Sequence, residues 1–140
     1  MMHWVNDYIG KPWEKGAAGP DAYDCGGLVR TVMRTHYGIE LRDIGADCAS
    51  LIRQVRAIDS DPAWSAFAQV GTPQDGDLVK LIRQTRPMHV GIWVALSTGG
   101  GILHAHQGGG VVFDEPWIVM AKGWGKLEYY RFKGALCRRC

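Results

Sequence analysis

The sequence predicts one α+β domain in which N-terminal helices pack on an antiparallel sheet of about five strands. Helical periodicity dominates the first half of the 140-residue chain. From about Gly71 onward, short β-type runs alternate with glycine-rich turns, and such close spacing favours antiparallel pairing. No repeat or low-complexity linker divides the chain, so we expect a single domain over residues 1–140.

Composition and charge narrow the class of protein. Hydrophobic residues make up 46% of the chain and charged residues 21%, as in soluble globular domains. The formal net charge of +2 argues against a nucleic-acid partner. The longest apolar run, Val90–Leu96, is far shorter than the roughly 18 residues that span a bilayer, so no membrane insertion is expected. Met1–Asp7 shows no basic and apolar pattern, so we expect no signal peptide and a cytoplasmic location on synthesis.

Helices are predicted in the first half of the chain. Residues 3–9 form a short helix that ends before Pro12. Apolar side chains at spacings of three and four predict a helix from Cys25 to about His36, with Asp24 as N-cap and Gly38 as the C-terminal stop. Two weaker helix candidates, each opened by an Asp, are Asp47–Val55 and Asp61–Phe67.

Strands are predicted in the second half, separated by turns at 72–77, 97–101 and 107–110. Each run is short and carries several apolar side chains, and glycine or proline lies between successive runs, which is typical of strands. The five predicted strands are Leu78–Ile82, Met88–Leu96, Ile102–His106, Val111–Phe113 and Leu127–Phe132.

Cys25 is the candidate nucleophile, because it lies at the predicted start of a helix. A thiol attacks as the thiolate, which the positive end of the helix dipole stabilises. Gly26 and Gly27 are poor helix formers, so their presence at a helix start indicates a purpose beyond folding. We expect both glycines to leave room for a substrate to approach the sulfur.

A nucleophilic cysteine needs a histidine base and a group that orients it. His36 lies eleven residues along the same helix as Cys25, roughly 16 Å away, which excludes a direct pair. His89 opens a predicted strand and is the candidate base. His104 and His106 lie on the next strand and face the same side, so either could orient His89.

Other readings of the cysteines and histidines are weaker. Cys48 is interpreted as an inert small hydrophobe, and Cys137 and Cys140 as part of a frayed tail. A zinc site built from His89, His104 and His106 lacks a metalloprotease-type Glu and leaves Cys25 without a purpose. We therefore predict neither a metal nor another cofactor.

Four segments together resemble the NlpC-type cell-wall cysteine peptidases, a compact branch of the papain-like fold. They occur in the family's order and are YDCGGLV at 23–29, QDGDLV at 74–79, MHVGI at 88–92 and ILHA at 102–105. The resemblance implies that Cys25 is the nucleophile, His89 the general base and later acid, and His104 the orienting residue. The implied reaction is hydrolysis of an amide bond in the peptide stem of peptidoglycan through an acyl-enzyme.

The resemblance also implies where substrate binds. We predict that Trp13, Asp24, Gly26 and His106 contact it. Two positions depart from the family pattern: Gly26 stands where Ser is frequent, and Trp13 where Tyr is frequent. Trp donates an N–H but cannot reproduce a phenol.

The segments around Trp13 and Cys25 are most similar to phage-tail and gene-transfer-particle members of the family. This similarity implies a tail-tip protein that opens the cell wall, with tail or baseplate proteins as partners and the particle as its final location. Two alternatives stay open: a docking module with a vestigial site, and a thiol acyltransferase that passes the acyl group to an amine.

Overall fold

The structure is a computed structural model that describes residues 3–41, 67–84 and 86–133. Several predictions fall outside these ranges. They are the helix at Asp47–Val55, all but the last residue of the helix at Asp61–Phe67, and the surroundings of Cys48, Cys137 and Cys140.

The N-terminal part contains a short 3-10 helix, η1 (Trp4–Asp7), and the long helix α1 (Cys25–Tyr37). The predicted boundaries of α1 are confirmed. Asp24 is the N-cap and accepts a hydrogen bond from the Gly27 N–H, while Gly38 ends the helix with φ +68°. No helix within the described ranges is long and apolar enough to cross a bilayer.

Six strands form one antiparallel sheet in the order β1-β6-β2-β3-β4-β5. Their bounds are β1 (Phe67–Val70), β2 (Leu78–Arg83), β3 (Arg86–Leu96), β4 (Gly99–His106), β5 (Gly110–Asp114) and β6 (Lys126–Phe132). The run β2-β3-β4-β5 is the expected meander. The last strand does not extend it, because β6 returns to pair with β2 and β1.

Two elements were missed in the sequence, and one turn is shorter than expected. Strand β1 has only four residues, and Phe67, predicted to end a helix, instead pairs with Phe132 of β6. Helix α3 (Pro116–Ala121) has only six residues, fewer than two turns, with Pro at its first position. Strand β4 already begins at Gly99, and Gly100 lies so close to the Trp93 ring that a Cβ atom would fall 2.6 Å from it.

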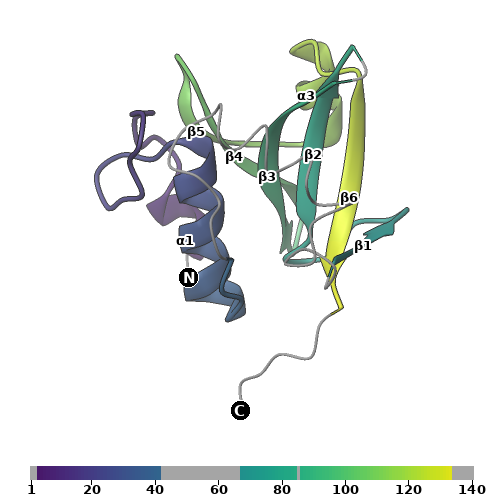
Figure 1. The fold of residues 1–140 in the computed structure, drawn as a ribbon, viewed down its shortest axis with the longest axis horizontal. Coiled ribbons are helices and arrows are strands. Elements are labelled where there is room, and N and C mark those ends of the chain that lie inside the picture. Colours follow the sequence, from purple (N-terminus) through teal and green to yellow (C-terminus); the bar gives the residue numbers. More distant parts are fainter. Residues whose placement is uncertain (1–2, 42–66, 85, 134–140) are drawn as a thin grey trace.

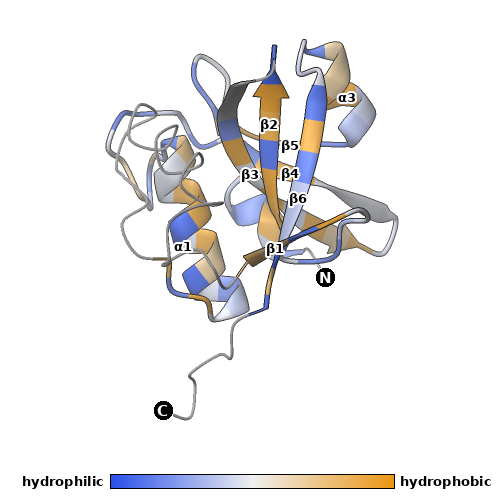
Figure 2. Ribbon diagram, turned by 45° about the vertical axis from the view of Figure 1, so that its right-hand side comes forward, coloured by the Kyte–Doolittle hydropathy of each residue, from blue (hydrophilic) through white to orange (hydrophobic). Residues whose placement is uncertain are grey.

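Helices α1 and α3 lie on opposite sides of the sheet (Figure 1). Helix α1 packs against β3 and β4, and α3 packs against β5. The main core lies between α1 and the sheet, and the apolar stripe of α1 faces it (Figure 2). A second, smaller cluster lies on the α3 side. Its buried members are Val79, Leu81, Ile102, Val119 and Trp124.

An ion pair fixes the turn that leads into β2. Asp77 is almost fully buried, and both of its carboxylate oxygens accept hydrogen bonds from Arg131 of β6, at 3.0 and 2.8 Å. Arg131 also donates to the Thr72 carbonyl at 2.9 Å. This two-pronged contact ties the 72–77 turn to the neighbouring strand β6 at the point where β2 begins.

Candidate active site

Two buried histidines on neighbouring strands form the centre of the candidate site. His89 Nε2 lies 3.0 Å from His104 Nδ1, and the two rings meet edge to face. Gly91 makes this contact possible, because a Cβ there would come within 2.8 Å of the Leu103 carbonyl and 3.0 Å of the His104 Cβ. The absence of a side chain at Gly91 therefore lets β3 approach β4 beside the histidine pair.

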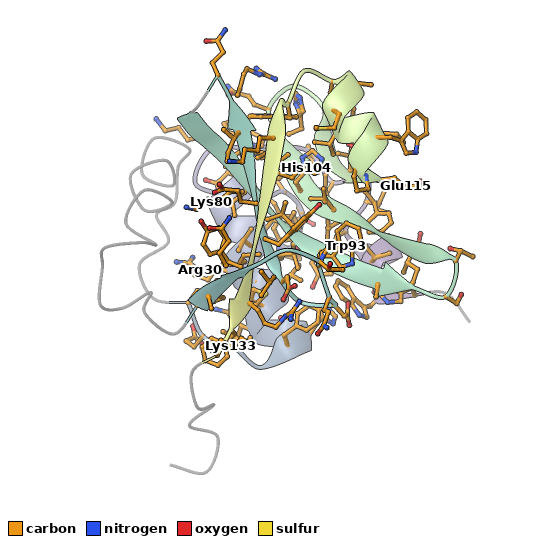
Figure 3. All side chains as sticks on the ribbon, turned by 90° about the vertical axis from the view of Figure 1, so that its right-hand side faces the viewer. Arg30, Lys80, Trp93, His104, Glu115 and Lys133 are labelled. Atoms are coloured by element: carbon orange, nitrogen blue, oxygen red, sulfur yellow. The ribbon has the colours of Figure 1, made fainter. Side chains whose placement is uncertain are left out.

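A carboxylate and an amine extend the pair. His104 Nε2 lies 3.1 Å from Asp114 Oδ2 at the end of β5, and Lys122 Nζ donates to the same oxygen at 2.6 Å. Lys122 directly follows α3, and the labelled His104 lies beside that helix (Figure 3). His104 is wholly buried and Asp114 nearly so, whereas Lys122 is partly exposed. A continuous chain of contacts thus runs from His89 to the surface at Lys122.

An aromatic ring covers His89. The Trp124 indole stacks on it, with ring centroids 5.6 Å apart and planes within 17°. The Arg83 guanidinium lies 4.2 Å from a Trp124 ring centroid. The Trp124 Nε1 is buried and has no hydrogen-bond partner among the described residues. Trp124 therefore holds the His89 ring by its face, without a polar contact.

Burial keeps both histidines neutral. It lowers the pKa of His89 well below its usual value, and His104, His106 and Arg83 lower it further. Burial also lowers the pKa of His104, although Asp114 opposes this shift. Burial acts to raise the pKa of Asp114, but hydrogen bonds from His104 and Lys122 outweigh it and hold that pKa below its usual range. At neutral pH His89 and His104 are therefore neutral imidazoles, and Asp114 is a carboxylate.

These shifts predict that acidification destabilises the fold. In the unfolded protein, His89 and His104 take up protons near pH 6.5, whereas burial in the folded protein lowers their pKa values and they resist protonation. The unfolded state then binds more protons, so the free energy of unfolding falls as pH drops below about 6.5. Denaturant unfolding at about pH 7.5 and pH 5.5 checks this, and a constant or rising stability at the lower pH would contradict it.

Cys25 is the first residue of α1, as predicted, and its side chain is wholly buried. It belongs to the main core cluster together with Val90 and Leu103. Val90 directly follows His89 in β3, and Leu103 directly precedes His104 in β4. The start of α1 thus packs on the face of β3 and β4 that carries Val90 and Leu103, whereas Trp124 of the second cluster stacks on His89.

The cap residue and the second glycine of the motif shape the start of α1. Asp24 is fully buried, and its carboxylate accepts hydrogen bonds from the N–H groups of Gly16 and Gly27. A Cβ at Gly27 would lie 2.1 Å from the Ala17 carbonyl oxygen. The expectation that Gly27 makes room for substrate is therefore wrong, since the 17–18 backbone occupies that space. A substrate contact by Asp24 stays a prediction.

The remaining predicted site residues lie in three places. Trp13 forms a parallel bridge with Tyr23, packs on the main core and has a buried Nε1 with no hydrogen-bond partner among the described residues. Gly26 is buried in the first turn of α1. His106 lies at the end of β4, where its Nδ1 is 2.7 Å from the Gln107 carbonyl and its ring 6.5 Å from that of His104. Their contacts with substrate stay predictions.

The structure decides between the two candidate partners of His89. The sequence pattern left His104 and His106 open, and the hydrogen bond is to His104, as the family resemblance implied. His36 belongs to a separate cluster, stacked on Trp4 and hydrogen-bonded to Tyr8. In the described ranges, no three His, Cys, Asp or Glu side chains are grouped as metal ligands.

Asp114, Lys122 and Trp124 were missed by the sequence reasoning. One signal could have found Asp114: His104 pairs with Val112 across β4 and β5, and the residue two positions on faces the same side. Lys122 and Trp124 follow a short helix that was itself not predicted, so nothing in the sequence placed them beside the histidines.

The fold and site define a class: an α+β domain with a cysteine at a helix start and a buried histidine pair on the adjoining strands. The profile of the NlpC/P60 family matches residues 10–125, and the chain belongs to this family.

Two relatives illustrate the similarity. "Probable endopeptidase p60" of Listeria grayi is 29% identical over 119 residues, which cover 85% of this chain. The chain spans about a fifth of that protein's length, 19%. The crystal structure of the NlpC/p60 domain of the peptidoglycan hydrolase SagA superposes with a TM-score of 0.56 at 24% identity, covering 90% of each chain. That structural similarity establishes the shared fold.

Proposed function

We propose that this domain is a cysteine endopeptidase that hydrolyses an amide bond in the peptide stem of peptidoglycan. The observation that carries the proposal is the buried His89–His104 pair on strands against which the Cys25 helix packs. Family membership adds support, and a cysteine at a helix start together with an oriented histidine supplies the groups that acyl transfer needs.

In the first half of the reaction, His89 takes the proton of the Cys25 thiol as the sulfur attacks the scissile carbonyl carbon. The new C–S bond converts the carbonyl into a tetrahedral oxyanion. Backbone N–H groups at the start of α1, including that of Cys25, donate to this oxyanion. The Gly27 N–H is not among them, since it donates to Asp24. Collapse breaks the C–N bond, and His89 returns the proton to the leaving amine.

In the second half, water replaces the amine. The neutral His89 takes a proton from water as its oxygen attacks the thioester carbon. Collapse of the second oxyanion breaks the C–S bond, and the proton on His89 returns to the sulfur. The products are a carboxylic acid and an amine, and the enzyme is regenerated without a redox change. Burial lowers the pKa of His89, so its ring is in the basic form at neutral pH and has a lone pair to take the proton.

Purified sacculi or a soluble stem peptide test the proposal. The intact domain is expected to release a new amine and a new carboxyl terminus, and Cys25→Ala to lower this release about 10³-fold or more. Folding of the variant is checked by its thermal midpoint. Equal release by both proteins, or none by either, would contradict the proposal.

The second candidate function is a docking module with a vestigial site. The complete burial of Cys25 is the observation that favours it, because a nucleophile must meet its substrate. A domain that binds sacculi without releasing product, in both wild type and Cys25→Ala, would support this alternative. Amide formation with an added amine in place of hydrolysis would instead indicate an acyltransferase.

As the setting for this activity we propose the tail tip of a phage-like particle, with tail or baseplate proteins as partners. The support is the similarity of the segments around Trp13 and Cys25 to tail-associated members of the family. The protein would be made in the cytoplasm and carried on the particle. Detection of the chain in purified particles tests this setting, and its absence from them would contradict it.

A further inference from the structure

Asp114 and Lys122 take no part in the steps above, yet they end the chain of contacts that begins at His89. An ionised carboxylate only accepts hydrogen bonds, and an ammonium group only donates them. Lys122 donates to Asp114 Oδ2, and the same oxygen lies 3.1 Å from His104 Nε2. The proton between His104 and Asp114 must therefore sit on the His104 nitrogen.

This placement decides the protonation of both rings. A neutral imidazole has one N–H and one bare nitrogen. With its proton on Nε2, His104 presents a bare Nδ1, which lies 3.0 Å from His89 Nε2. Two bare nitrogens cannot hydrogen-bond, so the His89 proton must sit on its Nε2. The Nδ1 of His89 is then left with a lone pair, which makes it the basic nitrogen.

We propose that Asp114, held by Lys122, is a positioning residue that fixes the tautomers of two successive histidines and so makes Nδ1 of His89 the base. The assignment of the tautomers stands on the contacts of His104 and Asp114. Their importance for turnover rests on the proposed function, in which His89 takes the proton of Cys25.

The ring geometry alone does not select these tautomers. Without an acceptor beside its Nε2, His104 is equally able to carry its proton on Nδ1. It would then donate to His89 Nε2, and the His89 proton would move to Nδ1. That tautomer has no lone pair on the nitrogen assigned to the thiol proton, so the base would be blocked. Asp114 removes this second arrangement.

Nitrogen-15 NMR of the histidine side chains tests the proposal on the intact, resting domain. At about pH 7.5, both His89 and His104 are expected to show a protonated Nε2 and a bare Nδ1. A proton on Nδ1 of either ring as the major form would overturn the proposal, whatever the activity of the protein.

Three variants separate tautomer control from general packing. Asp114→Ala removes the acceptor and is expected to mix the tautomers of both rings. It should lower kcat/KM about 10- to 100-fold, less than the loss of a triad carboxylate, because His104 stands between Asp114 and the base His89. Asp114→Asn retains a carbonyl oxygen that accepts from His104 and Lys122, so it should restore the tautomers. Glu115→Ala is the matched control, because this neighbouring carboxylate is exposed and contacts Trp117 instead.

Different results bear on the role of Asp114 and on the peptidase activity. Wild-type tautomers in Asp114→Ala, or mixed tautomers in Asp114→Asn, would overturn the proposal for Asp114 even if activity falls. Normal turnover by Cys25→Ala would instead overturn the proposed function and leave the tautomer assignment intact. Thermal midpoints of all variants show whether each retains the fold.

Discussion

Replacing His89 by Ala is expected to lower kcat/KM for stem-peptide hydrolysis by about 10³-fold or more. The variant loses the group that takes the Cys25 proton and returns it to the leaving amine. It also leaves His104 Nδ1 without the ring that lies 3.0 Å away. Steady-state kinetics on a soluble stem peptide measure the effect, and binding should persist because His89 acts on the reacting atoms.

His36→Ala is the matched control for this loss. It also removes an imidazole, but one that stacks on Trp4 and bonds to Tyr8 near the end of α1. This variant should lose stability and keep most of its turnover per folded molecule. Equal losses of turnover in the two variants would show that folding, not base catalysis, explains the His89 result.

Gly27→Ala is expected to destabilise the fold by about 3 kcal/mol. Helix propensity predicts the opposite sign, because Ala is favoured over Gly inside a helix by about 1 kcal/mol. Sterics decide, since the new Cβ would lie 2.1 Å from the Ala17 carbonyl oxygen and backbone cannot rotate aside as a side chain does. Denaturant unfolding measures the difference.

Gly71→Ala provides the matched control, because a Cβ at that position meets nothing within 4 Å. We expect this variant to stay within about 0.5 kcal/mol of the wild type. A Gly27→Ala protein as stable as the wild type would mean that the 17–18 backbone does not hold the start of α1 in the described position.

Local signals in the sequence predicted much of the fold. The apolar spacing between Asp24 and Gly38 sets a single helix, because both ends carry strong capping residues. Short connections separate β2, β3, β4 and β5, so their meander follows from local chain reversals. The place of β6 between β1 and β2 depends on long-range pairing, which no local pattern encodes.

The site residues also fall into those that local sequence signals single out and those that depend on long-range contacts. Cys25 could be singled out because it opens α1, and His89 because the sequence predicts a strand that starts beside it, although β3 itself begins at Arg86. The choice of His104 over His106 needed either the family resemblance or the register of β3 against β4. Gly27 was misread because its meaning depends on Ala17, ten residues away across a loop.

The coupled titration of Cys25 and His89 tests the central claim most directly. Cysteine Cβ carbon-13 and histidine nitrogen-15 shifts follow the two groups in wild type, His89→Ala and Cys25→Ala. If the thiol and the imidazole contact each other, removing either group moves the titration of the other. Unchanged titration of each group in the absence of the other would contradict the account.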